Sequence, residues 1–155
     1  MKWRIRGGWT ELIRNGQLRD AVAILTKDYV TAVLANDRYL SSIIFEELYK
    51  ALCESKKILP EKPGINVFKI LELMRNMVVE EVFRRGEDVE LIIEDFKLNS
   101  EFLLKKYADK EFRKILKEDL LRDAFDLDDE KYKEKRERVL RILEDLLEKD
   151  YCIPP

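Results

Sequence analysis

Apolar residues recur at steps of three and four along most of the chain, the spacing that places them on one face of a helix. The clearest case is the run from Leu18 to Ile58, where Asn36-Asp37 separates two such stripes. Neither stripe is stable in water, so the two helices are predicted to bury them against each other and against later elements. The pattern therefore predicts a helical hairpin around which the rest of the chain is organised.

Further stripes extend the helical pattern to most of the remaining chain. They predict helices at 66–85, 87–107, 110–125 and 130–149, and Thr10 is predicted to cap a short helix that ends at Arg14. No segment alternates apolar and polar residues with β-branched enrichment, so no sheet is expected. The predicted fold class is all-α: a single antiparallel helical bundle of about five long helices plus a short N-terminal helix. One domain spans 1–155, with an N-terminal arm (1–9), the bundle (10–150) and a tail (151–155).

The core of this bundle should contain one residue from the centre of each main stripe. Such residues lie on the face that a packed helix turns away from solvent. The stripes predict burial of Leu25, Leu48, Met74, Phe96 and Leu143.

The composition fits amphipathic helices and narrows the chemistry. Charged residues make up 40% of the 155-residue chain and hydrophobic residues 46%, while the net charge is only -2. Overall charge therefore neither attracts nor repels nucleic acid. The abundance of charges of both signs, with a single glutamine, is typical of a thermophile's protein. The chain has no histidine, so no imidazole is available as a general base or metal ligand.

The cysteines and acidic clusters favour structural roles, and no catalytic residue, metal or cofactor is predicted. Cys53 should be a buried thiol and Cys152 lies in the tail, so we expect a reduced pair in a cytoplasmic protein. No apolar run is long enough to cross a membrane, and no signal-peptide core follows the basic start. The acidic residues at 123–130 lack the glycine of a calcium loop and are interpreted as a helix start. In each of the adjacent pairs Glu46-Glu47 and Glu80-Glu81, one member is expected to face water because neighbouring helical residues point about 100° apart, and the pairs are interpreted as solvated faces.

Two basic segments are candidates for binding. Lysine and arginine alternate with tryptophan in the N-terminal arm, a combination that holds phosphates and stacks bases. A second group of lysines surrounds the junction near residue 107. An ordinary solvated surface is the alternative interpretation of both, because such runs are frequent. The candidate binding residues are Trp3, Arg4, Arg6, Trp9, Lys105, Lys106 and Tyr107.

Three segments, in order, resemble the HEPN superfamily of helical proteins. Residues 39–52 resemble the family's helix with a Lys-Ala-Leu-like ending, 63–71 its proline-rich turn, and 102–109 its Tyr-x-x-x-Arg-Tyr-Pro-Asp ending. The resemblance implies an antiparallel bundle that often dimerises, in defence, toxin–antitoxin and nucleotidyltransferase-partner systems. Its nuclease members use an Arg followed by a His, which this chain lacks.

We therefore expect a non-catalytic, HEPN-like module that contacts a partner protein, a nucleotide or RNA. The alternative is a structural or assembly subunit of a larger complex, or a homo-oligomeric protein of viral or plasmid origin, with no nucleic-acid role. A carboxylate-based, metal-dependent enzyme ranks last. Apolar and aromatic residues at both termini also predict a homodimer, although they equally allow the termini to fold back on the bundle: Trp3, Ile5, Trp9, Tyr151 and Ile153.

Overall fold

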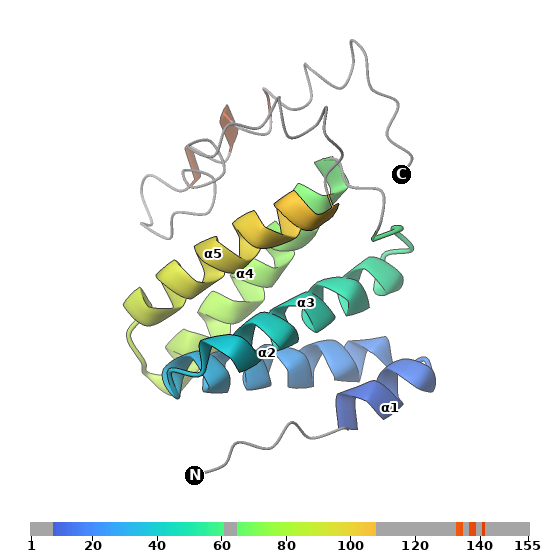
Figure 1. Ribbon diagram of the computed structural model, residues 1–155, viewed down its shortest axis with the longest axis horizontal. Helices are drawn as coiled ribbons and strands as arrows, with labels where there is room; N and C mark the ends of the chain where they lie inside the picture. Colours follow the sequence, from blue (N-terminus) through green and yellow to red (C-terminus); the bar gives the residue numbers. More distant parts are fainter. Residues whose placement is uncertain (1–7, 61–64, 108–132, 135–136, 139–140, 142–155) are drawn as a thin grey trace.

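The computed structural model describes residues 8–60, 65–107, 133–134, 137–138 and 141. Within these ranges the chain forms a packed helical bundle, and no strand occurs among them. The predicted all-α class is confirmed. Figure 1 shows two helical hairpins packed on each other, with the short first helix lying against the start of the second. The helices are α1 (Gly8–Arg14), α2 (Leu18–Leu34), α3 (Arg38–Ser55), α4 (Ile65–Arg85) and α5 (Glu90–Tyr107).

The predicted hairpin corresponds to α2 and α3. Asp37 is the predicted N-cap of α3, and its side chain accepts a hydrogen bond from the backbone N–H of Leu40 at 3.1 Å. The helix ends at Ser55, before Pro60, and α4 begins within one residue of its predicted start. Local capping chemistry thus fixes most helix ends where the sequence indicated.

Two predicted helix starts are wrong. The first helix begins at Gly8, so Thr10 lies inside it rather than capping it. The last described long helix begins at Glu90 rather than Glu87, because the Asp88 side chain accepts the Glu90 N–H at 3.0 Å and the helical ladder opens only after that turn. The predicted helix at 110–125, the acidic residues 123–130 and Leu143 lie outside the described residues. Of the predicted helix at 130–149, residues 133–134, 137–138 and 141 are described and are helical.

Four helices end with the same hydrogen-bonding motif. In each, one residue has a left-handed backbone, and its own N–H and that of the following residue donate hydrogen bonds back to carbonyls in the last turn. Glycine and asparagine tolerate this conformation, and they occupy it after α1, α2 and α4. After α3 the position is a lysine, with φ 57°. The four residues are Gly16, Asn36, Lys57 and Gly86.

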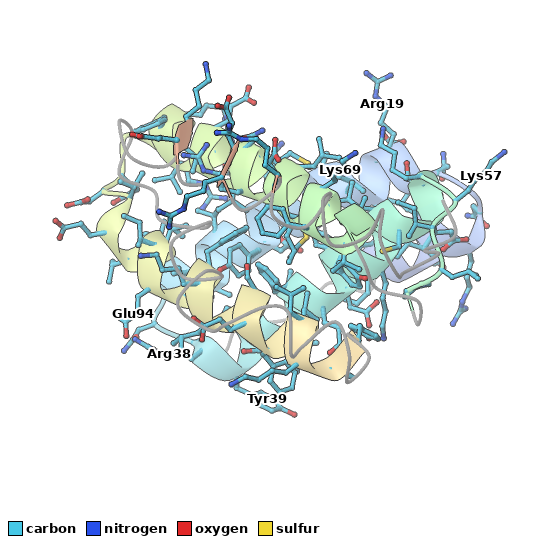
Figure 2. All side chains as sticks on the ribbon, turned by 90° about the horizontal axis from the view of Figure 1, so that it is seen from above. Arg19, Arg38, Tyr39, Lys57, Lys69 and Glu94 are labelled. Carbon is cyan, nitrogen blue, oxygen red and sulfur yellow. The ribbon has the colours of Figure 1, made fainter. Side chains whose placement is uncertain are left out.

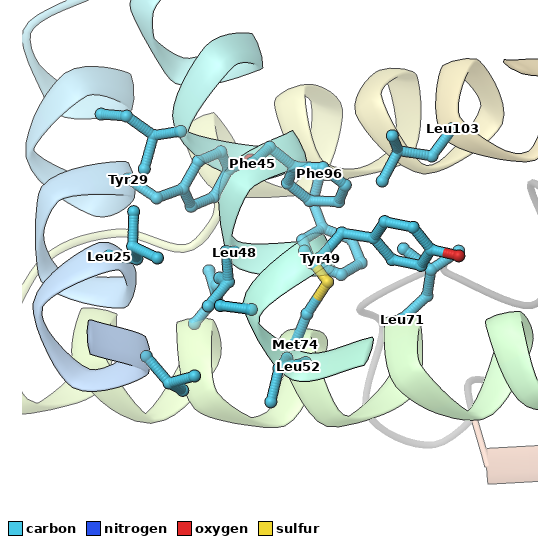
Figure 3. Packing of buried hydrophobic residues seen from close by; sticks show 14 of the residues in the cluster. Leu25, Tyr29, Phe45, Leu48, Tyr49, Leu52, Leu71, Met74, Phe96 and Leu103 are labelled. Carbon is cyan, nitrogen blue, oxygen red and sulfur yellow. The ribbon is translucent and has the colours of Figure 1, made fainter. Parts of the chain in front are cut away.

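The core lies between the two hairpins. Leu25, Leu48, Met74 and Phe96 are fully buried, which confirms the predictions for the described part of the core (Figure 3). Aromatic rings join three helices there. The ring of Phe45 on α3 lies 5.4 Å from that of Tyr29 on α2 and 5.2 Å from that of Phe96 on α5, in tilted and edge-on arrangements.

A buried polar cluster ties α5 to the first hairpin. Asp95 accepts the Tyr29 hydroxyl at 2.6 Å, the Ser41 hydroxyl at 2.9 Å and the Asn99 amide at 2.6 Å. All four residues are buried, so the cluster is closed to ligands and its role is to position helices. Burial, followed by the nearby Asp95 carboxyl group, raises the pKa of Tyr29 well above its ordinary value.

Candidate functional site

The C-terminal end of α5 lies against the middle of α3, around the carboxylate of Glu46. This side chain is bonded to the Lys106 ammonium group, and it accepts the Tyr107 hydroxyl at 2.6 Å. Lys50, one turn further along α3, lies 3.8 Å from the same carboxylate. The structure therefore brings together two of the predicted binding residues, Lys106 and Tyr107, and fixes both through one acidic residue.

The ring of Tyr107 is held by aromatic contacts as well as by its hydroxyl. It stacks on Tyr49 with ring centroids 5.4 Å apart and an interplanar angle of 30°. The ammonium group of Lys106 lies 5.4 Å from the centroid of the Tyr107 ring, within the range of a cation–π contact. Because several contacts fix it, the Tyr107 ring is a preorganised surface rather than a freely rotating one.

Glu46 should make the stability of the fold depend on pH. Its partial burial raises its pKa, but hydrogen bonds from Lys106 and Tyr107 outweigh that effect, so the net pKa is lowered. A lowered folded-state pKa stabilises the fold above the unfolded-state value, and this stabilisation is lost as pH falls through the folded-state value. We therefore expect the free energy of unfolding to fall less steeply in Glu46→Gln than in the wild type between about pH 7 and pH 3.

Urea unfolding at a series of pH values would measure this difference. Glu80→Gln is the matched control, because it removes the charge of an exposed carboxylate on α4. The control should follow the wild-type profile. A Glu46→Gln profile parallel to that of the wild type would show that the Glu46 interactions contribute nothing to stability.

A pocket of about 530 Å³ opens beside Tyr107. Its volume is within the range of small-molecule sites, and its lining combines apolar side chains, an aromatic ring and two lysines. Leu59 is 56% exposed, so part of its apolar surface is open to the pocket. The lining residues are Lys50, Glu54, Lys57, Ile58, Leu59, Pro60 and Tyr107.

Lys57, which lines this pocket, has a backbone conformation that is unfavourable for lysine. Its left-handed conformation closes the end of α3, with its own N–H bonded to the carbonyl of Glu54 at 3.1 Å and that of Ile58 bonded to Cys53 at 2.7 Å. A residue with a Cβ pays about 1–2 kcal/mol for this conformation. Glycine, which has no Cβ, occupies the equivalent position at two of the other helix ends, and asparagine, which tolerates the conformation better than lysine, occupies it at the third. Strained residues of this kind cluster at binding sites.

The remaining predicted binding residues are not part of this region. Lys105 is exposed on α5 beside Lys106. Trp9 is only 8% exposed and packs in the hydrophobic core, so its ring is not on the surface. Trp3, Arg4 and Arg6 lie outside the described residues.

Six of the seven lining residues were not predicted from the sequence: Lys50, Glu54, Lys57, Ile58, Leu59 and Pro60. Lys50 follows the Glu46-Glu47 pair at helical spacing, and no binding role was assigned to it. Lys57 and Leu59 lie in a connection, where helical periodicity gives no information. A lysine where a helix-ending glycine is expected, just ahead of Pro60, was the signal that could have identified Lys57.

Glu80 is exposed, as expected for one member of the Glu80-Glu81 pair, but Glu81 is not part of a solvated face. That side chain is 7% exposed, and it accepts hydrogen bonds from Arg84 and Arg85 at 2.6–3.1 Å. Arg85 also donates to the Thr31 hydroxyl at 2.9 Å, which links α4 to α2. Burial raises the pKa of Glu81, but the two arginines outweigh it and lower the pKa overall. The burial of Glu81 was not predicted, because the two arginines one turn away neutralise its carboxylate and allow it to be buried between helices.

The described residues meet the requirements of neither a metal-ligand cluster nor a membrane-spanning helix. Among them, no group of three or more Cys, Asp or Glu side chains lies close enough to hold a metal ion. None of the described helices has the length and apolar character needed to cross a membrane. Cys53 is buried as predicted and is not in a disulfide, and Cys152 lies outside the described residues.

No protein-family model, curated protein or solved structure matches this chain. The HEPN resemblance therefore rests on the sequence segments alone.

Proposed function

We propose that this protein is a non-catalytic, HEPN-like binding module whose pocket at the ends of α3 and α5 takes a nucleotide, either free or as part of an RNA. The single observation that carries the proposal is this pocket, where a fixed aromatic ring and apolar side chains lie beside two lysines. Its function in a defence or toxin–antitoxin system follows from the resemblance, not from the pocket.

The lining matches the two halves of a nucleotide. A base has apolar faces that pack on Ile58, Leu59 and the Tyr107 ring. A phosphate group is complementary to the ammonium groups of Lys50 and Lys57. In an RNA, further phosphates would extend toward Lys105 and Lys106 on α5. The absence of histidine from the sequence supports binding without the family's nuclease chemistry.

The position of Lys57 supports the proposal further. A glycine there would close the helix at lower energy, and the chain uses glycine or asparagine at the other three ends. The lysine therefore adds a cation to the pocket at the expense of stability. Lys57 makes no ion pair with other described residues, whereas Lys50 is shared between Glu46 and Glu47 at 3.8 and 4.0 Å. Lys57 is thus the better placed of the two to neutralise a phosphate.

We expect Lys57→Gln to weaken the binding of adenosine monophosphate about tenfold, as for the loss of one charged hydrogen bond. Isothermal titration calorimetry on the full chain measures the affinity. The matched control is Lys56→Gln, which removes the same charge from the preceding exposed residue, outside the pocket. The control should bind within about twofold of the wild type, which is the change expected from long-range charge alone.

Lys57→Gly separates binding from stability at the same position. It removes the strained Cβ, so we expect a gain of about 1 kcal/mol in the free energy of unfolding together with weaker nucleotide binding. A wild-type chain that fails to bind the nucleotide at millimolar concentration contradicts the proposal. Equal losses in the Lys56 and Lys57 variants would show that only overall charge matters.

A second candidate function is that of an assembly subunit, as a homodimer or with another protein. The observation that favours it is a line of exposed apolar side chains on α5: Leu91, Leu98 and Phe102. A cytoplasmic location stays a prediction.

A further inference from the structure

The outward face of α5 carries apolar side chains in a line. Leu91, Leu98 and Phe102 are 59%, 50% and 59% exposed, and their spacings of seven and four residues place them on one side of the helix. The buried residues Ile92 and Phe96 lie on the opposite side. Single exposed leucines are common on proteins, but three exposed apolar side chains on one side of a helix are typical of an interaction surface.

Charges on the same face are arranged in a definite order. Glu94 lies toward the start of α5 and Lys105 toward its end, both within the apolar line by helical spacing. Leu98 and Phe102 are each two residues from position 100, while Glu94 and Lys105 are six and five residues from it. The face is therefore self-complementary when a second copy is placed antiparallel about position 100.

We propose that this face of α5 is an interface between two copies of the chain, packed antiparallel about a two-fold axis near residue 100. Leu98 of each copy packs against Phe102 of the other, and Glu94 of each lies within one residue of Lys105 of the other. The inference rests on the second candidate function, assembly, and is independent of the nucleotide pocket.

The start of α3 extends the same surface. Arg38 forms an ion pair with Glu94 at 3.4 Å, and both side chains are more than half exposed, so Glu94 remains accessible to a second cation. Tyr39 beside it is 81% exposed, and Figure 2 shows it projecting from the molecule on the α5 side, opposite Lys69. Aromatic residues of this kind are enriched at protein interfaces.

Charge reversal tests the antiparallel arrangement directly. In Glu94→Lys, two lysines face each other at both ends of the pair, and in Lys105→Glu two glutamates do. Sedimentation of each full-length variant at micromolar concentration should show a dimer weakened about tenfold or more, because like charges are placed together. An equimolar mixture of the two variants restores opposite charges at both ends, so it should recover the dimer.

Matched controls separate this interface from general effects. Lys69→Glu, on α4, makes the same charge change as Lys105→Glu away from the face and should remain dimeric. Phe102→Ser should weaken the dimer, while Phe83→Ser, which replaces an equally exposed ring on α4, should not. Circular dichroism confirms that each variant is folded.

Three results would overturn the proposal. One is a wild-type chain that sediments as a monomer, since the face would then be covered by the same chain or by a different protein. The others are a mixture that does not recover the dimer, and equal effects of Phe83→Ser and Phe102→Ser. Lys57→Gln should retain the dimer, so loss of nucleotide binding and loss of assembly are observed independently.

Discussion

Replacing Leu48 with alanine should lower the free energy of unfolding by about 2–5 kcal/mol, the range for large-to-small changes in packed cores. Leu48 is fully buried on α3, and Figure 3 shows it between the side chains of α2 and α4. The change removes buried apolar surface and leaves a cavity that fixed neighbouring rings do not readily fill. Urea unfolding followed by circular dichroism measures the loss.

Leu73→Ala on α4 is the matched control, because it makes the same chemical change at an exposed position. It should change the free energy of unfolding by no more than about 0.5 kcal/mol. If both variants were equally stable, Leu48 would not be buried, and α3 would not pack in the register described above.

Asp95→Ala should cost about 3 kcal/mol, because it removes the acceptor shared by three buried donors. Two of those donors have another acceptor: Ser41 also donates to the Arg38 carbonyl at 3.0 Å, and Asn99 to the backbone carbonyl of residue 95 at 3.0 Å. The Tyr29 hydroxyl donates to the Asp95 carboxylate, with no backbone carbonyl bonded to it among the described residues, and it is fully buried. Most of the penalty should therefore come from Tyr29.

A double-mutant cycle isolates this contribution. Tyr29→Phe should destabilise the wild type, since it removes a donor from Asp95, but it should restore stability in the Asp95→Ala background by removing the stranded hydroxyl. Chemical unfolding of the four proteins gives the coupling energy. Additive losses would mean that Tyr29 and Asp95 act separately and that the cluster does not tie α5 to the hairpin.

The fold was largely predictable because its signals are local. Helical periodicity gave the stripes, and asparagine, aspartate and glycine marked most of the ends. The buried polar cluster was not predicted, since its members lie on three helices and hydrogen bonds between distant segments leave no periodic pattern. Asp95 and Asn99 inside the apolar stripe of α5 were the available sign that a buried acceptor was needed.

The candidate site was predictable only in part. Lys106 and Tyr107 were expected from charge and from the family resemblance, and the structure places both beside the pocket. The opposite wall comes from the connection after α3, and the meeting of two helix ends separated by about fifty residues depends on packing. The prediction for Trp9 was wrong in the opposite way. Its position in a basic arm suggested a ring that stacks on bases, but the ring is buried in the hydrophobic core.

The hairpin of α2 and α3 also has a consequence for how the chain folds. These two helices share the most extensive contacts among the described helices, and three residues, 35–37, join them. Closing so short a loop costs little chain entropy, so a large part of the final packing becomes accessible before any distant segments meet. Folding can therefore nucleate within residues 18–55, with the α4–α5 pair condensing onto a surface that already exists.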